Sequence, residues 1–427
     1  MSSARAAGAP DAGRGFLSRQ AVLGVYLPAL CFEIGIGAVT PMVAVRAVQL
    51  GTTLAMAGVL AALLAVGQIL GDVPAGALAA RIGDRNALLV AAVASAAMLA
   101  VCALAGSPLL FGIAVLLTGA TNAVYMLARQ AYVTEITPPL FRARALSLLG
   151  GVARIGVFVG PFLGAGVVRL AGTVAVFWLA LAVVAVAGVV VAVVPDVEVG
   201  RPAAAGGPHV PLRRVMVDHR RVFLSLGIAV LLVGATRGAR QVVLPLWGLH
   251  LGLAPATTSL LYGLSGALDM AVFYPAGKLM DRRGRLSVAV PSMLALGAAL
   301  LVLPLARGVL TVALVAMVMG LANGVGSGMI MTLGADVAPR AVRAQFLGVW
   351  RLLSDTGAAT GPLVVAAGAG LGSLAGGVLV MGGVGVVTAG VLRATVPRWS
   401  VHANARTRVT AGLTPEGRPI APAPPPR

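Results

Sequence analysis

The stretch "PAGKLMDRRG", residues 275–284, has a counterpart earlier in the same chain. Residues 74–83, "PAGALAARIG", match it without a gap at a shift of 201 residues. At the same shift, "TEITPPLFRARALSLLGGVARIGVFVGP" (134–161) matches "ADVAPRAVRAQFLGVWRLLSDTGAATGP" (335–362), with proline, arginine and glycine positions in common. Coincidence at one constant shift is improbable over such a length. We therefore interpret the chain as a tandem duplication.

The composition predicts that both halves lie in a membrane. Of the 427 residues, 59% are hydrophobic and only 11% are charged, whereas soluble domains carry about 25% charged residues. Apolar segments long enough to cross a bilayer of about 30 Å recur along nearly the whole chain. The sequence therefore predicts an all-α membrane protein. Its twelve transmembrane helices would form two pseudo-symmetric six-helix bundles, related by an axis along the membrane normal.

Charge clusters and Gly/Pro breaks divide the chain into regions. We expect a cytoplasmic N-terminal tail at 1–20, an N-terminal bundle at 21–194, a cytoplasmic linker at 195–221, a C-terminal bundle at 222–394 and a disordered cytoplasmic tail at 395–427. The predicted helices of the first bundle lie at 21–46, 54–80, 87–105, 108–133, 145–170 and 173–194. Those of the second bundle lie at 222–250, 256–280, 286–305, 309–335, 346–368 and 372–394.

The basic residues predict the orientation. Most of the 32 lysines and arginines lie in short gaps on one side of the apolar segments, and such residues mark the cytoplasmic side. Both termini are therefore predicted to be cytoplasmic. The net charge of +19 reflects topology, and no nucleic-acid partner is expected. The excess of arginine over lysine and the richness in Ala, Gly and Val suggest a high-GC bacterium, so the predicted location is the bacterial inner (plasma) membrane.

The loop "GKLMDRRGR" (277–285) resembles the G-x-L-x-D-R-x-G-R signature of the major facilitator superfamily in full. The resemblance covers about 21–394 and implies that family's fold, with a cytoplasmic latch between the halves. The first-half loop, "GALAARIGDR" (76–85), departs from the signature, because Ala80 replaces the Asp and Asp84 replaces a basic residue. The implied latch residues are Gly76, Arg81, Gly83, Gly277, Asp281, Arg282, Gly284 and Arg285.

A second motif, "GVFVGPFLGA" (156–165), resembles the G-x-x-x-G-P-x-x-G-G pattern of the drug:proton antiporter branch of that family. Ala165 stands where the last Gly belongs. The resemblance implies export, and its residues here are Gly156, Gly160, Pro161 and Gly164. The alternative interpretation is ordinary packing, since small residues four positions apart let membrane helices approach closely and proline permits a bend.

Charged residues inside the apolar segments cost about 2.5–3.5 kcal/mol each on insertion scales, so their presence requires an explanation. Glu33 lies eight residues before a proline, and Arg237 likewise lies eight residues before one. This spacing pairs the two positions, and we expect Glu33 to face Arg237 or Arg240 across a central cavity. Arg154 and Asp355 are equivalent at the shift of 201, so symmetry-related positions carry opposite charges.

Two interpretations of these charges stay open. In the structural one, buried ion pairs neutralise each other and fix helix packing. In the functional one, burial disfavours a charged carboxylate and a nearby arginine favours it, so helix movement would load and release protons. The proton-coupling candidates are Glu33, Asp269 and Asp355. The substrate-cavity candidates are Arg237, Arg240, Asn122, Asn323 and Arg154, although the two asparagines could instead bridge helices.

The sequence contains no P-loop and no G-x-S-x-G or H-E-x-x-H motif, and its four histidines are scattered. We therefore expect no enzyme activity, no cofactor and no metal. The predicted function is secondary active transport by alternating access, with proton-coupled export of a small organic compound, a drug or metabolite. Proton-coupled uptake of a small metabolite is the alternative. The expected partners are a small-molecule substrate, protons and the lipid bilayer, and we expect a monomer.

Overall fold

Helices make up nearly all of the computed structural model, which describes residues 22–137, 142–194 and 212–416. The first half comprises a π-helical turn (Val22–Tyr26) and then α2 (Leu27–Gln49), α3 (Leu54–Ile82), α4 (Asp84–Leu104), α5 (Pro108–Ile136), α6 (Arg142–Ala171) and α7 (Thr173–Val193). The second comprises α8 (Leu212–Asp218), α9 (Arg220–Val222), α10 (Ile228–His250), α11 (Pro255–Arg283), α12 (Leu286–Val302), α13 (Val309–Val325), α14 (Met329–Val337), α15 (Arg343–Gly370), α16 (Leu374–Trp399) and α17 (Ala405–Thr410). The predicted tail at 1–20, most of the predicted linker and residues 417–427 lie outside the described residues.

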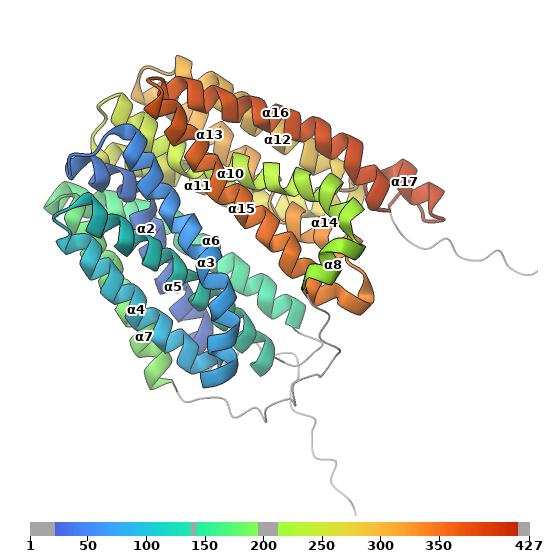
Figure 1. Cartoon of the computed structure of the whole chain (residues 1–427), viewed down its shortest axis with the longest axis horizontal. Coiled ribbons are helices and arrows are strands. Elements are labelled where there is room, and N and C mark those ends of the chain that lie inside the picture. Colours follow the sequence, from blue (N-terminus) through green and yellow to red (C-terminus); the bar gives the residue numbers. More distant parts are fainter. Residues whose placement is uncertain (1–21, 138–141, 195–211, 417–427) are drawn as a thin grey trace, which may run out of the picture.

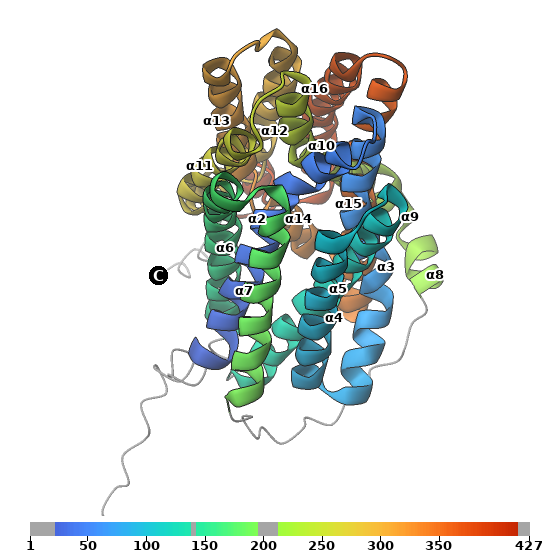
Figure 2. The same ribbon diagram turned by 90° about the vertical axis from the view of Figure 1, so that its left-hand side faces the viewer.

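The two halves form separate bundles that lie side by side (Figure 1, Figure 2). Across the boundary α3 contacts α15, α6 contacts α11, and α2 contacts α10. By length and composition, ten of the described helices could cross a membrane. The helices α11 and α15, with 29 and 28 residues, are as long but carry charged residues of the interior. The predicted all-α fold of two six-helix bundles is confirmed.

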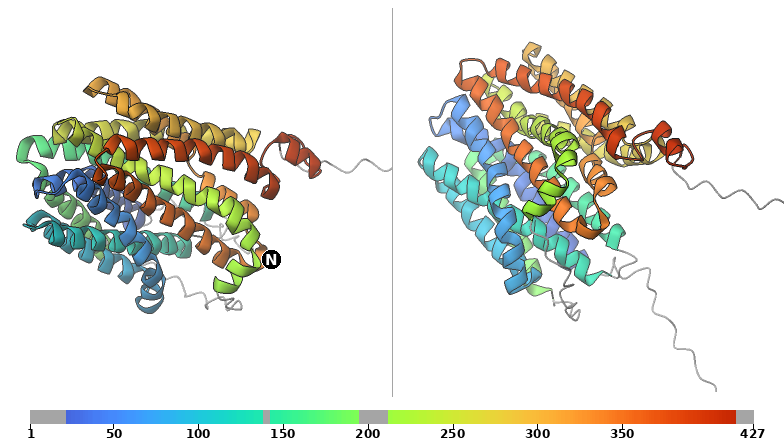
Figure 3. Two further views of the ribbon diagram at one scale, coloured as in Figure 1. Left: turned by 45° about the horizontal axis from the view of Figure 1, so that its top comes forward. Right: turned by 45° about the vertical axis from the view of Figure 1, so that its right-hand side comes forward.

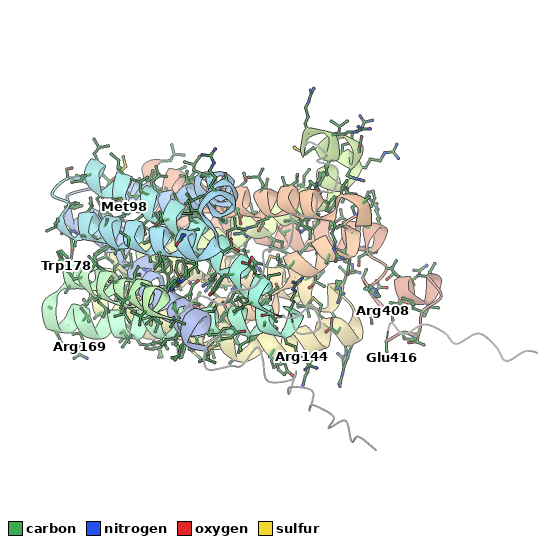
Figure 4. All side chains as sticks on the ribbon, turned by 90° about the horizontal axis from the view of Figure 1, so that it is seen from below. Met98, Arg144, Arg169, Trp178, Arg408 and Glu416 are labelled. Atoms are coloured by element: carbon green, nitrogen blue, oxygen red, sulfur yellow. The ribbon has the colours of Figure 1, made fainter. Side chains whose placement is uncertain are left out.

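Turns of the same kind connect α3 to α4 and α11 to α12. Gly83 and Gly284 have φ angles of +84° and +95°, a backbone region that glycine enters far more readily than other residues. This requirement explains why both matching stretches end in glycine. We name the end of the molecule that carries these turns the loop end, and the opposite end the far end. Figure 4 shows Arg144, at the start of α6, towards one end and Arg169, near its finish, at the other.

The duplication extends to the packing of helix pairs. A Cβ atom added at Gly160 of α6 would lie 2.5 Å from the carbonyl oxygen of Ile34 in α2. One added at Gly361 of α15 would lie 1.9 Å from the carbonyl oxygen of Ala235 in α10. Both members of these contacts are related by the shift of 201 residues. The pair α2–α6 is therefore equivalent to the pair α10–α15, and glycine allows the close approach of each.

The predicted continuous helix at 309–335 is wrong. The helix α13 ends at Val325, and α14 begins at Met329 after Gly328, whose φ angle is +78°. The sequence "GVGSG" (324–328) causes the break, because glycine is among the weakest helix formers and Gly328 supplies a left-handed backbone conformation. At membrane depth, such an interruption is tolerated where it is buried in protein or lines a cavity.

The predicted disorder of the C-terminal tail is also wrong as far as Glu416. The helix α16 continues beyond the predicted end, and α17 follows it (Figure 3). The side chain of Arg408 in α17 is 2% exposed and donates hydrogen bonds to the backbone carbonyls of Asp281 and Arg282 in the last turn of α11. These charge-assisted hydrogen bonds hold the segment against the second bundle. The polar composition of the segment gave no sign of this contact.

Candidate functional site

A large cavity opens between the two halves at the loop end. Its volume is about 1720 Å³, which exceeds the usual size of a drug-binding pocket. Arg81 and Glu135 line it from the first half, and Arg237, Arg351 and Asp355 line it from the second. In the part of the chain that the structure describes, no group of His, Cys, Asp and Glu residues is placed to hold a metal ion. The cavity therefore offers charged side chains of both signs.

The halves are in contact at the far end. A Cβ atom added at Gly58 of α3 would lie 3.0 Å from the Cβ atom of Ala366 in α15. Ser259 of α11 donates a hydrogen bond of 2.8 Å to the backbone carbonyl of Pro161 in α6. The molecule is thus open between its halves at the loop end and packed together at the far end. This is one of the two conformations that alternating access requires.

Asp269 of α11 lies at the centre of a charged network that joins the halves. One carboxylate oxygen lies 3.3 Å from Nη1 of Arg154 in α6, and the other lies 3.7 Å from Nη2 of Arg240 in α10. Asn323 of α13 donates a hydrogen bond of 2.5 Å to the same carboxylate. Of these partners, Arg154 belongs to the first half and the others to the second. The structure therefore brings together four residues that the sequence proposed separately.

The break between α13 and α14 lies beside this network. Arg237 donates a hydrogen bond of 2.5 Å to the backbone carbonyl of Gly326, and Arg154 donates one to the hydroxyl of Ser327. Lipid offers no hydrogen bonds to the backbone of an interrupted helix, so Arg237 supplies one to a freed carbonyl, while Arg154 holds a side chain of the break. These partners lie 89 and 173 residues away along the chain. Local sequence reasoning could not find them.

The prediction that Glu33 faces Arg237 or Arg240 is wrong. Its carboxylate lies 2.7 Å from Nη1 of Arg129 in α5, and both side chains are less than one tenth exposed. The error lies in the register, because the glycine contacts show that the shift of 201 also relates α2 to α10. Glu33 is therefore equivalent to Gly234. The two prolines that suggested the pairing with Arg237 are offset from this register by three residues.

Sequence reasoning missed Arg129 as a site residue. It lies on α5 seven residues after Asn122, which is two helical turns and hence the same face. That spacing, together with its position inside an apolar segment, was the available signal. The Glu33–Arg129 pair joins α2 to α5 and lies wholly within the first half.

We expect Glu33→Gln to destabilise the protein strongly, because it leaves the guanidinium of Arg129 buried without its counter-charge. Removing one partner of a buried ion pair costs about 3–5 kcal/mol. The measurement is thermal unfolding of the purified protein in detergent. The double variant Glu33→Gln with Arg129→Gln should be less destabilised than Glu33→Gln alone. An unchanged melting temperature for Glu33→Gln would contradict the buried pair.

Asp355 belongs to a second cluster nearer the loop end. It lies 3.4 Å from Arg351, one turn earlier in α15, and Arg351 also lies 3.7 Å from Asp72 of α3. Arg351 therefore links the two halves, because its guanidinium group pairs with one carboxylate from each half. Arg154, the equivalent of Asp355 at the shift of 201, has Asp269 as its partner instead. The two symmetric positions thus take part in different cross-half contacts.

A smaller cavity of about 280 Å³ lies between α2, α3, α5 and α10. Glu33, Asn122 and Gln241 are among its lining residues. The amide oxygen of Asn122 is buried and has no hydrogen-bond partner among the described residues. Its equivalent in the second half, Asn323, is bound to Asp269. The two asparagines therefore differ: Asn323 bridges helices, and Asn122 faces a cavity.

The latch residues of the second half interact within that half. Arg285 lies 3.2 Å from Asp281 and 3.0 Å from Asp336 of α14. Burial lowers the pKa of Arg285, but the hydrogen bonds and charges of Asp336 and Asp281 outweigh it, and the net effect raises that pKa. Arg81 and Gly83 line the large cavity. A latch between the halves therefore stays a prediction for a conformation in which the loop end is closed.

The residues of the export motif pack α6 against α2. A Cβ atom added at Gly156 would lie 2.5 Å from that of Glu33, and one added at Gly164 would lie 3.4 Å from the carbonyl oxygen of Ala38. These distances, with those at Gly160, support helix packing as one role of the motif. Its role in export stays a prediction.

Comparison with known proteins gives one family. The model described as Major Facilitator Superfamily matches residues 25–362 and 226–422. A relative from Yersinia enterocolitica, "Multidrug resistance protein MdtH", is 26% identical over 279 residues, covering 63% of this chain and 67% of the relative. Another of that name, from Shigella boydii, is 27% identical over 262 residues, covering 59% of this chain and 62% of the relative. The match thus spans less than two thirds of the second relative.

Solved structures share the fold at low sequence identity. The nucleoside transporter NupG has a TM-score of 0.70 at 15% identity, covering 87% of this chain and 98% of NupG. A POT family transporter in complex with a thioalcohol conjugated peptide has a TM-score of 0.73 at 14% identity, covering 89% of this chain and 96% of that transporter. A D-xylose-proton symporter has a TM-score of 0.66 at 15% identity, covering 91% of this chain and 98% of the symporter. At these identities the likeness concerns the fold alone.

Proposed function

We propose that this chain, a multi-pass membrane transporter that belongs to the Major Facilitator Superfamily, exports a small organic compound in exchange for protons. The observation that carries the proposal is the ion pair between Arg154 and Asp269. It joins the two halves near the cavity at the loop end, while the halves are in contact at the far end. Because alternating access rocks one half against the other, this pair forms in one conformation and breaks in the next.

A proton on Asp269 would make that movement possible. Separating a mostly buried ion pair is costly while both partners stay charged, and a protonated carboxyl group has no charge to separate. When the loop end opens, Arg154 returns to Asp269 and favours its charged form, so the proton leaves there. Asp269 would thus take up its proton while the far end is open and release it at the loop end.

The substrate must permit the same movement in the opposite direction. A compound in the cavity that pairs with Arg154 in place of Asp269 satisfies this condition, because Asp269 keeps Arg240 and Asn323 as partners within its own half. A carrier with neither ligand retains the ion pair and does not change conformation. Export and proton entry would therefore be coupled.

Among the carboxylate candidates, Asp269 is the one whose arginine partner moves away during rocking. The Glu33–Arg129 pair lies within the first bundle, so both of its partners move together. Asp355 keeps Arg351 on its own helix. We therefore place the coupling proton on Asp269 and regard Glu33 as a residue that supports helix packing.

Export is supported by two observations. The curated relatives are named multidrug resistance proteins, and α6 carries the motif at 156–165 that resembles the exporter pattern. We place the loop end and both termini in the cytoplasm, because the positive-inside rule favours that orientation. The cavity would then accept substrate from the cytoplasm of a bacterium, across its inner membrane.

Proteoliposomes with an imposed pH gradient test the proposal. Two probes of similar size and permanent charge, benzenesulfonate and phenyltrimethylammonium, are offered outside the vesicles. Accumulation of either probe in vesicles with an acidic lumen, and its absence without a gradient, is the expected result. Accumulation of the probe only in vesicles with an alkaline lumen would overturn exchange.

Proton-coupled uptake is a second candidate, favoured by one observation. Arginines surround Asp269, so its protonation frees them for an anionic substrate, and proton and substrate could then bind and travel together. The alkaline-lumen result of the same experiment would establish this alternative.

A further inference from the structure

Three arginines of the central network share one acidic side chain. Asp269 is paired with Arg154 and Arg240. The third, Arg237, donates to a backbone carbonyl and lines the large cavity. The cluster therefore carries an excess of two positive charges beside the cavity, at a depth where an unbalanced charge is costly.

The neighbouring cluster shows the opposite balance. Arg351 lies within ion-pair distance of both Asp72 and Asp355. Elsewhere in the cavity lining, Arg81 and Arg142 are matched in number by Asp84 and Glu135. The positive excess is therefore concentrated at Arg154, Arg237 and Arg240. A site with this local excess attracts negative charge.

Two of the three arginines also have unused hydrogen-bond donors. The Nε atoms of Arg237 and Arg240 are buried and have no partner among the described residues. Buried polar atoms are normally paired, and guanidinium groups bind carboxylates and related anions with two parallel hydrogen bonds. The cluster therefore has both the charge and the donors for an anionic oxygen-bearing group.

The broken helix adds to the same potential. The helix α14 begins at the break, and Gly328 and Ile330 at its start line the cavity together with Arg237. The N-terminus of a helix carries a partial positive charge and free N–H groups. Arg154 is held at this break through Ser327, and Arg237 reaches the cavity beside the same break.

We infer that Arg154, Arg237 and Arg240 form the binding site for the anionic group of the transported compound, a carboxylate, sulfonate or phosphate. The inference rests on the proposed function and names its substrate class. Met126, Leu127, Met331 and Leu347 also line the cavity, so the remainder of the compound is an apolar organic group. The substrate class is therefore small amphipathic organic anions.

The site also explains how substrate replaces the proton. An anion that pairs with Arg154 takes the place of Asp269 and relieves the cross-half contact, as a proton on Asp269 does. A substrate without negative charge would leave Arg154 bound to Asp269. Selection for anions and exchange with protons therefore depend on the same ion pair.

Binding to the purified full-length protein in detergent tests this inference, with benzenesulfonate as the probe and phenyltrimethylammonium as its cationic counterpart. Benzenesulfonate should bind and phenyltrimethylammonium should not. Arg237→Gln should weaken benzenesulfonate binding by about tenfold or more, because a charge-assisted donor is lost. Arg307→Gln is the control, since it removes an exposed arginine of the turn before α13 that lines neither cavity, and should leave that affinity unchanged.

Asp269→Asn gives a test that misfolding cannot imitate. It removes the carboxylate that competes with the probe, so the affinity for benzenesulfonate should rise by about tenfold. Equal or tighter binding of phenyltrimethylammonium, or no gain in Asp269→Asn, would overturn the inference. Exchange of the cationic probe alone in acidic-lumen vesicles would overturn the inferred anion site but would leave the proposed proton exchange standing. Anion binding without gradient-driven exchange would support the anion site and overturn the proposed proton exchange.

Discussion

Asp269→Asn is expected to abolish proton-driven accumulation in proteoliposomes. The amide imitates a permanently protonated carboxyl group, so Arg154 loses its charged partner and no proton can be released there. Removing one partner of a buried pair is worth about 3 kcal/mol or more, which corresponds to a shift of roughly a hundredfold in the balance between two conformations. Partial exposure of the Arg154 side chain, at 34%, places the effect at the lower end. The measurement is probe accumulation with and without a pH gradient.

Asp355→Asn is the matched control for this experiment. It removes a carboxylate of the neighbouring cluster, where Asp72 still pairs with Arg351. Gradient-driven accumulation should therefore persist in Asp355→Asn. Full gradient dependence in Asp269→Asn, or its loss in Asp355→Asn alone, would contradict the assignment of the coupling proton to Asp269.

Gly160→Ala is expected to cause the largest loss of stability among single-methyl additions in α6. The new Cβ atom would lie 2.5 Å from the carbonyl oxygen of Ile34 and 2.6 Å from the backbone nitrogen of Ala38. Backbone atoms cannot move aside as a flexible side chain does, so α2 and α6 must separate. Overpacking of this kind costs about 1–3 kcal/mol and more where the backbone must shift. A large fall in the detergent melting temperature, or loss of folded protein, is the expected result.

Gly166→Ala on the same helix provides the comparison. A Cβ atom at this position has nothing within 4 Å, and alanine is a better helix former than glycine by about 1 kcal/mol. Its melting temperature should equal or exceed that of the wild type. Similar melting temperatures for Gly160→Ala and Gly166→Ala would refute the close approach of α2 and α6.

The repeated stretches at 74–83 and 275–284 predicted the two-bundle fold because each marks the same turn between two helices. Apolar length then located the helices, since a bilayer imposes a minimum span. The break in the tenth helix was missed because glycine is common in membrane helices, and only its arginine partners from other helices show that this one is interrupted. The order of the C-terminal segment likewise depends on Arg408, whose acceptors lie far away in sequence.

The sequence identified most charged residues of the site but not their partners. Glu33 and Asp269 can be recognised from the sequence, because a carboxylate inside an apolar segment is energetically unfavourable and therefore conspicuous. Pairing depends on which helices are neighbours and on their rotation, so Arg129 went unrecognised as the partner of Glu33. The prolines led to the wrong pairing of Arg237 with Glu33. The two helices pack in the register of the 201-residue shift, but their prolines are three residues out of that register.

The most direct measurement of the central claim is the distance across the loop end as a function of pH. Spin labels at Gln130→Cys in α5 and Gly348→Cys in α15 would report it, because both positions line opposite walls of the cavity, in a background with Cys31 and Cys102 replaced. We expect a long distance at alkaline pH, with a growing population of short distances as the pH falls. Asp269→Asn should show a mixture of short and long distances that does not change with pH. A wild-type distance that does not respond to pH, or an equal response in Asp269→Asn, would contradict the claim that this carboxylate couples protons to movement.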